Sequence, residues 1–155
     1  MSRIVRATGA HVEPLAALMA SSPLLRRYRV TEREAKASLT EAFRARDLLL
    51  VATDGETVLG FAWAITTRAL DGAAYLRLLL ISEEHQSRGI GAALLARVER
   101  EARASRCRHL VLLVTRTNRR ARSFYERHGY THVGDLAGFV RPGIAEALYL
   151  KSWRT

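Results

Sequence analysis

The chain has 155 residues, of which 48% are hydrophobic and 26% are charged, a balance that excludes a disordered polar tail and a fibrous repeat. Cys107 is the only cysteine, so the chain has no intramolecular disulfide and no cysteine-based zinc site. No apolar run reaches the ~20 residues of a membrane span, and none at the N-terminus resembles a signal peptide. We therefore expect one cytoplasmic domain over residues 1–155 and no membrane partner.

The net charge of +10 is concentrated in one segment. Residues 86–127 carry 11 basic and 3 acidic side chains, a net +8, whereas residues 1–85 and 128–155 each carry +1. Such a block is typical of a solvated helix face or of an anion-binding surface. A basic nucleic-acid-binding domain is an alternative, but the segment lacks interleaved aromatic residues and any helix-turn-helix or zinc pattern, which disfavours nucleic acid as a partner.

The first half of the chain predicts two helices and then three strands. Thr31 and Glu34 form a T-x-x-E capping box, which is typical of a helix start. Asp54-Gly55 lies between two β-like runs and predicts a hairpin. From these signals and the hydrophobic periodicity we expect a strand at 4–7, a helix from about 12, a loop at 21–30, a helix at 31–46 and meander strands at 48–53, 57–67 and 74–81.

The second half alternates helix and strand. Apolar residues from Ile90 to Ala102 share one helical face, and Gly129 stands where a left-handed cap would end a helix. We expect a helix from about 89, a strand at 110–115, a helix at 119–128 and strands at 130–134 and 146–153. This order predicts a mixed α/β sandwich, because three consecutive meander strands exclude a doubly wound parallel sheet.

The segment between the strand at 74–81 and the next helix carries the pattern Gln86-x-x-Gly89-x-Gly91. Glycines there let the backbone approach a ligand, and the unpaired N–H groups of the first helical turn point outward, as in a pyrophosphate cradle. Arg88 adds a cation. A dinucleotide-binding fingerprint is excluded, because its third glycine position holds Leu94 and the unit comes late in the chain.

A second motif follows: an asparagine, then a helix with the pattern A-x-x-F-Y-x-x-x-G-Y. Its members are Asn118, Ala121, Phe124, Tyr125, Gly129 and Tyr130. Together the two motifs resemble the GNAT superfamily of acyl-CoA-dependent N-acetyltransferases, whose element order covers essentially the whole chain. The resemblance implies a mostly antiparallel sheet of about six or seven strands, with helices on both faces and a V-shaped splay between two parallel strands, at 78–81 and 110–114.

The resemblance also implies acetyl-CoA as co-substrate, without a metal. Backbone groups near Leu79 and Ile81 would pair with the pantetheine amides as an added strand would. One or two of Arg119, Arg120 and Arg122 would meet the 3′-phosphate, and Asn118 would contact the cofactor or only cap its helix. The complete set of implied cofactor residues is Leu79, Leu80, Ile81, Gln86, Ser87, Arg88, Gly89, Ile90, Gly91, Ala92, Asn118, Arg122 and Tyr125.

The implied reaction is attack by a neutral primary amine on a thioester, with the acceptor an unidentified small molecule or peptide. Tyr125 matches the family's general acid toward the CoA sulfur. The strand at 74–81 lacks the glutamate that some relatives use as base, so Glu83 and Glu84 at its end are the candidates. His85, Glu32, Glu34 and His132 are further alternatives. A non-catalytic acyl-CoA sensor is an alternative function, and the sequence is compatible with a homodimer.

Overall fold

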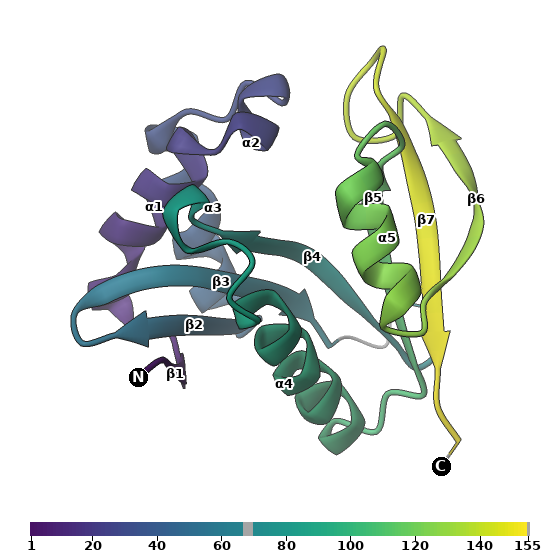
Figure 1. Cartoon of the computed structure of the whole chain (residues 1–155), viewed down its shortest axis with the longest axis horizontal. Helices are drawn as coiled ribbons and strands as arrows, with labels where there is room; N and C mark the ends of the chain where they lie inside the picture. The colour runs from purple at the N-terminus through teal and green to yellow at the C-terminus, as the bar shows by residue number, and fades with distance from the viewer. Residues whose placement is uncertain (67–69, 155) are drawn as a thin grey trace. The chain divides into compact units, whose positions relative to one another are not determined.

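The computed structural model describes residues 1–66 and 70–154. The helices within these ranges are η1 (Gly9–His11), α1 (Val12–Ser21), α2 (Pro23–Arg27), α3 (Glu32–Arg44), η2 (Glu83–His85), α4 (Ile90–Ala104) and α5 (Arg119–Arg127), where η marks a 3-10 helix. The strands are β1 (Arg3–Arg6), β2 (Leu48–Asp54), β3 (Thr57–Ile65), β4 (Ala73–Ile81), β5 (His109–Thr115), β6 (Thr131–Ala137) and β7 (Ala145–Ser152) (Figure 1).

The seven strands follow the order β1-β2-β3-β4-β5-β7-β6 in one sheet. β1–β2, β2–β3, β5–β7 and β6–β7 are antiparallel, and β4–β5 is parallel. The parallel register runs from Ala73 opposite His109 to Leu76 opposite Leu112, whereas β5 continues to Thr115. The prediction of a mixed α/β fold with a mostly antiparallel sheet is confirmed.

The chain divides into two compact units. Unit 1 comprises residues 1–64 and 78–98, and unit 2 comprises residues 65–77 and 99–155. The first part of β4 therefore belongs to unit 2 and its last part to unit 1. Each unit has its own packing.

In unit 1, one face of β2 and β3 packs against α1, α2 and α3. Leu49, Val51, Phe61 and Trp63 form a buried cluster with residues of these helices, and each buried large side chain contributes about 1.5–3 kcal/mol of stability. The Trp63 indole N–H donates to the Asp47 carboxylate at 2.9 Å. Because side chains alternate along a strand, the neighbouring residues of β2 point to the opposite face, which α4 covers (Figure 1).

The predicted loop at 21–30 is wrong in part, because Pro23–Arg27 forms the short helix α2. The Ser22 hydroxyl accepts from the Leu25 N–H at 3.5 Å, and Pro23 stands in the first turn, where its missing N–H costs nothing. The other elements are confirmed with small shifts of their ends. Of the predicted strand at 57–67, residue 67 lies outside the described ranges.

In unit 2, α5 packs on one face of the sheet around Tyr149, which is fully buried. The Tyr149 hydroxyl accepts from Arg122 Nε at 2.9 Å and donates to Glu126 at 2.8 Å. Glu99 accepts from both Lys151 Nζ and the Tyr130 hydroxyl, each at 2.9 Å. Cys107 is buried in this unit, and burial raises the pKa of its thiol.

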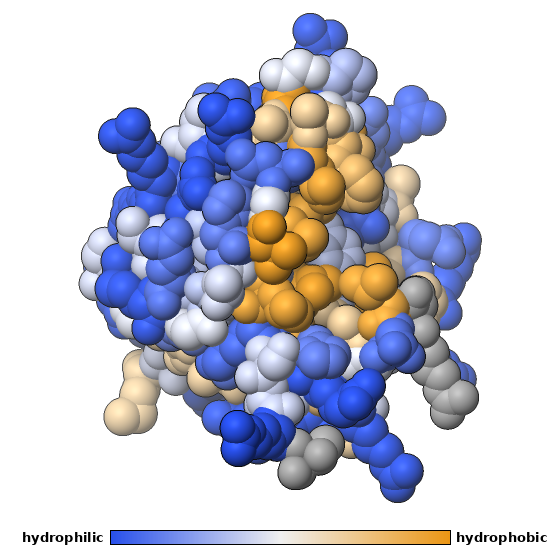
Figure 2. Space-filling model, turned by 90° about the vertical axis from the view of Figure 1, so that its right-hand side faces the viewer, coloured by the Kyte–Doolittle hydropathy of each residue, from blue (hydrophilic) through white to orange (hydrophobic). Residues whose placement is uncertain are grey.

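Apolar side chains reach the surface of unit 2 along β6 and the turn that follows it. Val133, Phe139 and Val140 are each more than half exposed. Figure 2, which views the side where β6 and β7 lie in Figure 1, shows apolar side chains gathered in a band on this side. β6 is the edge strand on this side of the sheet. A homodimer stays a prediction.

Candidate active site

The segment after β4 forms a tight turn that leads directly into α4. Ser87 and Gly89 both have left-handed backbone conformations, with φ of 63° and 77°. A Cβ on Gly89 would meet no protein atom within 4 Å, so glycine serves here for its φ and for open space beside the backbone. The first helical hydrogen bond runs from Ala93 N to Gly89 O at 3.0 Å. The N–H groups of residues 90–92 therefore have no partner within the helix and point out of its end.

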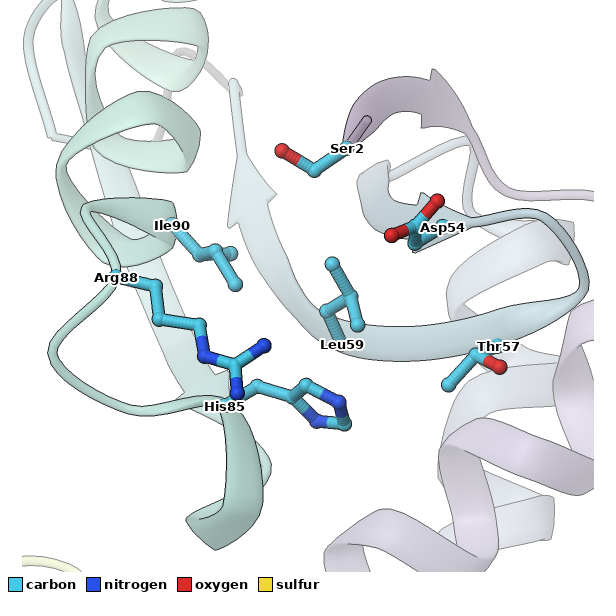
Figure 3. A pocket seen from close by; sticks show the side chains of 7 residues that line it. All are labelled: Ser2, Asp54, Thr57, Leu59, His85, Arg88 and Ile90. Carbon is cyan, nitrogen blue, oxygen red and sulfur yellow. The ribbon is translucent and has the colours of Figure 1, made fainter.

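Arg88 extends from this turn into a pocket of about 260 Å³ in unit 1. Figure 3 shows its guanidinium beside His85, facing Leu59 of β3. The other lining residues are Ser2, Asp54, Thr57 and Ile90. His85 is held by a hydrogen bond of 2.5 Å between its Nδ1 and Ser82 Oγ. Arg88 has no polar partner within the described ranges, so this cation at the start of α4 is available to an anion.

The last residues of β4 present backbone groups to both sides. Ser82 N–H donates to Leu59 O on β3 at 2.9 Å, so by alternation the backbone groups of Leu80 also face β3, and those of Leu79 and Ile81 face away. The Gln86 side-chain amide lies 3.5 Å from Ile81 O. The pairing of Leu79 and Ile81 with pantetheine amides stays a prediction.

Gly60 on β3 is a residue that the sequence reasoning missed. A Cβ there would lie 2.6 Å from Leu80 O and 3.0 Å from Ile81 Cα. Since both are backbone atoms of β4, no side-chain movement could relieve the contact. Gly60 thus permits the close approach of β3 to the part of β4 with the candidate pantetheine-binding groups. The available signal was a glycine inside an apolar strand pattern, which often marks close backbone approach.

Tyr125 of α5 lies in the core of unit 2 with 8% of its surface exposed. Its ring packs edge-on against Phe124 and Tyr130, with centroids 5.1 and 5.6 Å away, and burial raises the pKa of its phenol well above the usual range. Its hydroxyl has no hydrogen-bond partner in the described part of the chain. No fully buried side-chain oxygen there lacks a partner, so this hydroxyl reaches solvent and can bind a ligand.

The predicted residues around α5 have roles within the protein. Asn118 caps the helix, its side-chain oxygen accepting from Ala121 N at 3.1 Å. The Arg122 guanidinium donates to Tyr149 and to the Arg116 carbonyl. Arg119, by contrast, is exposed and has no polar partner among the described residues. A contact of Arg122 with a phosphate stays a prediction, and it would compete with these two hydrogen bonds within the protein.

The candidate bases occupy different environments. Glu83 and Glu84 are exposed on η2. The structure confirms the capping role of Glu34, whose carboxylate accepts from Thr31 N at 2.9 Å. Glu32 lies 3.6 Å from Lys36 Nζ, and His132 Nε2 lies 2.8 Å from the Asp135 carboxylate. No group of three metal-ligating side chains and no helix able to cross a membrane occurs within residues 1–66 and 70–154.

The candidate residues are divided between the two units. Leu79, Leu80, Ile81, Glu83, Glu84 and Gln86 to Ala92 lie in unit 1, and Asn118, Arg122 and Tyr125 lie in unit 2. Unit 1 brings together the end of β4, the turn and the start of α4. Unit 2 brings together Asn118, which caps α5, and the phenol of Tyr125.

The sequence of the chain matches the model of the Acetyltransferase (GNAT) family over residues 17–130. An acetyltransferase from Agrobacterium fabrum is 35% identical over 92 residues, a match that spans 59% of this chain and 64% of that relative. Because the family model covers more than half of the chain, the protein belongs to the GNAT acetyltransferase family.

Solved structures share the fold. A GNAT-family protein from Desulfovibrio desulfuricans superposes with a TM-score of 0.83 at 21% identity, covering 98% of this chain and 99% of that one. The PaiA N-acetyltransferase from Thermoplasma acidophilum, solved in complex with coenzyme A, gives a TM-score of 0.77 at 20% identity and 99% coverage of both chains. These likenesses establish the GNAT fold.

Proposed function

We propose that the protein is an acetyl-CoA-dependent N-acetyltransferase that acts on a primary amine. The observation that carries the proposal is the left-handed turn at Ser87 and Gly89, which leads into the start of α4. Beside it lies Arg88, which has no polar partner among the described residues. Such a turn offers several N–H groups and a cation to a pyrophosphate. Membership of the GNAT family and the coenzyme A complex of a protein with the same fold support this reading.

The residues of unit 1 would hold the cofactor. The N–H groups from Gln86 to Ala92 would bind the pyrophosphate, with Arg88 adding a charge-assisted hydrogen bond. Leu79 and Ile81 would bind the pantetheine amides through backbone groups that face away from β3. Of Arg119, Arg120 and Arg122, we propose Arg119 for the 3′-phosphate. The Arg122 guanidinium already binds Tyr149 and Arg116, and Arg119 has no polar partner among the described residues.

Acetyl-CoA supplies an activated thioester, and the protein supplies donors and proton transfer. The Ile81 N–H would polarise the carbonyl as charge develops on its oxygen. The Tyr125 hydroxyl would donate a proton to the departing sulfur. This phenol suits the role, because no acceptor in the described part of the chain competes for its proton.

The proposed pyrophosphate site at the start of α4 is tested by replacing two glycines that have similar surroundings and measuring acetyl-CoA binding. Gly89 and Gly143 both have positive φ, 77° and 83°, and a Cβ on either would meet no protein atom within 4 Å. Gly89→Ala and Gly143→Ala should therefore lose similar stability from backbone strain, about 1–2 kcal/mol. We expect calorimetry to show at least a ~10-fold loss of acetyl-CoA affinity for Gly89→Ala only, since its Cβ would enter the space of the phosphates. Equal acetyl-CoA affinities of the two folded variants would contradict a pyrophosphate site at Gly89.

Turnover is tested separately. The wild-type protein is mixed with acetyl-CoA and a panel of small primary amines and peptides, and release of the CoA thiol is followed. We expect thiol release that depends on the amine. Binding of acetyl-CoA without release across the panel would instead identify an acyl-CoA sensor.

A further inference from the structure

The pocket of unit 1 that Arg88 enters has no occupant in the mechanism above. Its volume of about 260 Å³ equals that of roughly nine water molecules in the liquid, slightly below the range of pockets for drug-sized ligands. All of its lining residues belong to unit 1 (Figure 3). The pocket is therefore formed within one compact unit, and its occupant must be small.

An apolar lining is present because a β-bulge turns a leucine toward the pocket. The register of β2 and β3 shifts between Ala52 and Thr53, which leaves Leu59 as an extra residue of β3. A bulge of this kind re-aims a side chain. Leu59 is 5% exposed and lines the pocket together with Ile90, the first residue of α4, which is 7% exposed. A ligand in the pocket would cover these two side chains with an apolar group.

Several polar groups that line the pocket lack a protein partner. Figure 3 shows the Arg88 guanidinium beside His85, and it has no polar partner among the described residues. The His85 ring is held through Nδ1 by Ser82 Oγ, and its Nε2 has no hydrogen-bond partner within residues 1–66 and 70–154. The same holds for the hydroxyls of Ser2 and Thr57. Polar groups on several sides of an apolar lining are typical of a small-molecule site.

The charges of the pocket favour an anion. Asp54 is an acidic lining residue, but its carboxylate is paired with the Met1 ammonium at 3.0 Å. Because this ion pair balances its own charge, the charge of Arg88 is left uncompensated. A guanidinium binds a planar carboxylate through two parallel hydrogen bonds. A carboxylate with a short apolar chain therefore matches both the cation and the apolar lining.

The pocket lies on the β3 side of β4. Leu59, which lines it, accepts through its carbonyl from the Ser82 N–H at 2.9 Å. The backbone groups of Leu79 and Ile81, proposed above for pantetheine, face away from β3. Arg88 is the residue that the pocket shares with the proposed pyrophosphate site. A guanidinium that a carboxylate holds in the pocket is not available to the pyrophosphate.

We propose that this pocket binds a small carboxylate with a short apolar chain, whose head group Arg88 holds and whose chain lies on Leu59 and Ile90. Occupation of the pocket weakens acetyl-CoA binding, a consequence that rests on the proposed function. By linkage, acetyl-CoA weakens carboxylate binding by the same factor. A small apolar carboxylate is thus a regulator of cofactor binding.

The probe is sodium pentanoate, with sodium chloride of equal ionic strength as reference. Binding is followed through the amide chemical shifts of the isotope-labelled protein. We expect saturable shifts at residues 57–59 and 85–90, with a dissociation constant of about 1 mM, since one exposed ion pair and a short chain give weak binding. Acetate, which lacks the chain, should bind about 5-fold or more weakly. Pentylamine, which has the chain and the opposite charge, should not shift these residues.

Two pairs of variants test the lining residues. Arg88→Gln should lose about 5-fold or more in pentanoate affinity, whereas Arg33→Gln, at an exposed arginine of α3 in the same unit, should not. Thr57 is exposed at the pocket wall. Thr57→Asp places a negative charge there and should bind pentanoate about 3-fold or more weakly than the uncharged Thr57→Asn. Thr57→Asn should keep the wild-type acetyl-CoA affinity.

Calorimetry with acetyl-CoA measures the coupling between the two sites. Saturating pentanoate should lower the acetyl-CoA affinity about 3-fold or more, and this effect should be absent in Arg88→Gln. An acetyl-CoA affinity that pentanoate leaves unchanged would overturn the sharing of Arg88.

Four results would overturn the carboxylate site itself: no saturable shifts, shifts confined to residues 90–92 at the start of α4, equal binding of pentanoate and pentylamine, or wild-type pentanoate affinity in Arg88→Gln. A protein that binds pentanoate in the pocket but does not bind acetyl-CoA would support the site and contradict the proposed function instead.

Discussion

The Tyr125 hydroxyl has no hydrogen-bond partner among residues 1–66 and 70–154, although its ring is almost wholly buried. Buried tyrosines usually satisfy this group, as Tyr130 and Tyr149 do with Glu99, Arg122 and Glu126. Burial also raises the pKa of Tyr125, which keeps the phenol protonated but widens its mismatch with a thiol whose ordinary pKa is about 8.5. Its effect on rate should therefore be moderate.

Tyr125→Phe removes only the hydroxyl and keeps the ring packing. We expect kcat to fall about 10- to 1000-fold while the acetyl-CoA dissociation constant changes less than about 3-fold, as for a group used mainly in the transition state. Tyr130→Phe is the matched control. It should lose about 1 kcal/mol of stability with its hydrogen bond to Glu99 and keep kcat. A wild-type kcat for Tyr125→Phe, with chemistry rate-limiting, would make Tyr125 a packing residue.

At this scale, the sequence predicts residues whose chemistry is local. The cap at Asn118 and the turn at Gly89 follow from motifs of a few positions. The burial of Glu146 could not be predicted in this way, because it is one acid in an apolar strand and its strand partners, Thr115 and Leu136, come from β5 and β6. Nor could the second role of Arg122, which depends on Tyr149, 27 residues away.

At the scale of elements, start and stop signals predicted most of the fold. The capping box of α3, the Asp54-Gly55 hairpin and the left-handed Gly129 are confirmed. α2 was not predicted, because Pro23 followed by the basic residues Arg26, Arg27 and Arg29 is typical of a loop. In the structure the same proline stands in the first turn of a helix that Ser22 caps.

Gly60 of β3 lies against the backbone of β4, so its replacement tests the contact between these two strands. Gly60→Ala should force β3 away from Leu80 and Ile81, because the new Cβ would lie 2.6 Å from a backbone oxygen. We expect a loss of about 1–3 kcal/mol in the free energy of unfolding and weaker acetyl-CoA binding. Gly134→Ala on β6, whose Cβ meets nothing within 4 Å, should be nearly neutral. Equal stability of the two variants by urea denaturation would contradict this account.

For the whole molecule, the buried phenols determine the alkaline limit of stability. The pKa values of Tyr75, Tyr125 and Tyr130 are raised in the folded state, with burial the largest cause in each. Unfolded tyrosines ionise near pH 10. Above that pH the unfolded state therefore releases protons that the folded state retains, and folding is penalised.

We expect the free energy of unfolding to change little with these groups between pH 8 and about 10 and to fall steadily above pH 10. Urea denaturation at pH 8, 9.5 and 11 measures the free energy of unfolding. The absorbance of tyrosinate should rise at a higher pH in the folded protein than in the unfolded protein. The Tyr125→Phe, Tyr130→Phe double variant should show a shallower fall. Undiminished stability at pH 11 would contradict the burial of these phenols.

The chain's single cysteine makes the protein its own unfolding reporter. Cys107 is 6% exposed, and burial raises the pKa of its thiol, so little reactive thiolate reaches a sulfhydryl reagent while the fold is intact. In a thiol-release assay the colour would therefore come from product and not from enzyme. One additional equivalent per chain would appear only as molecules open, so the same reagent could count damaged enzyme during turnover.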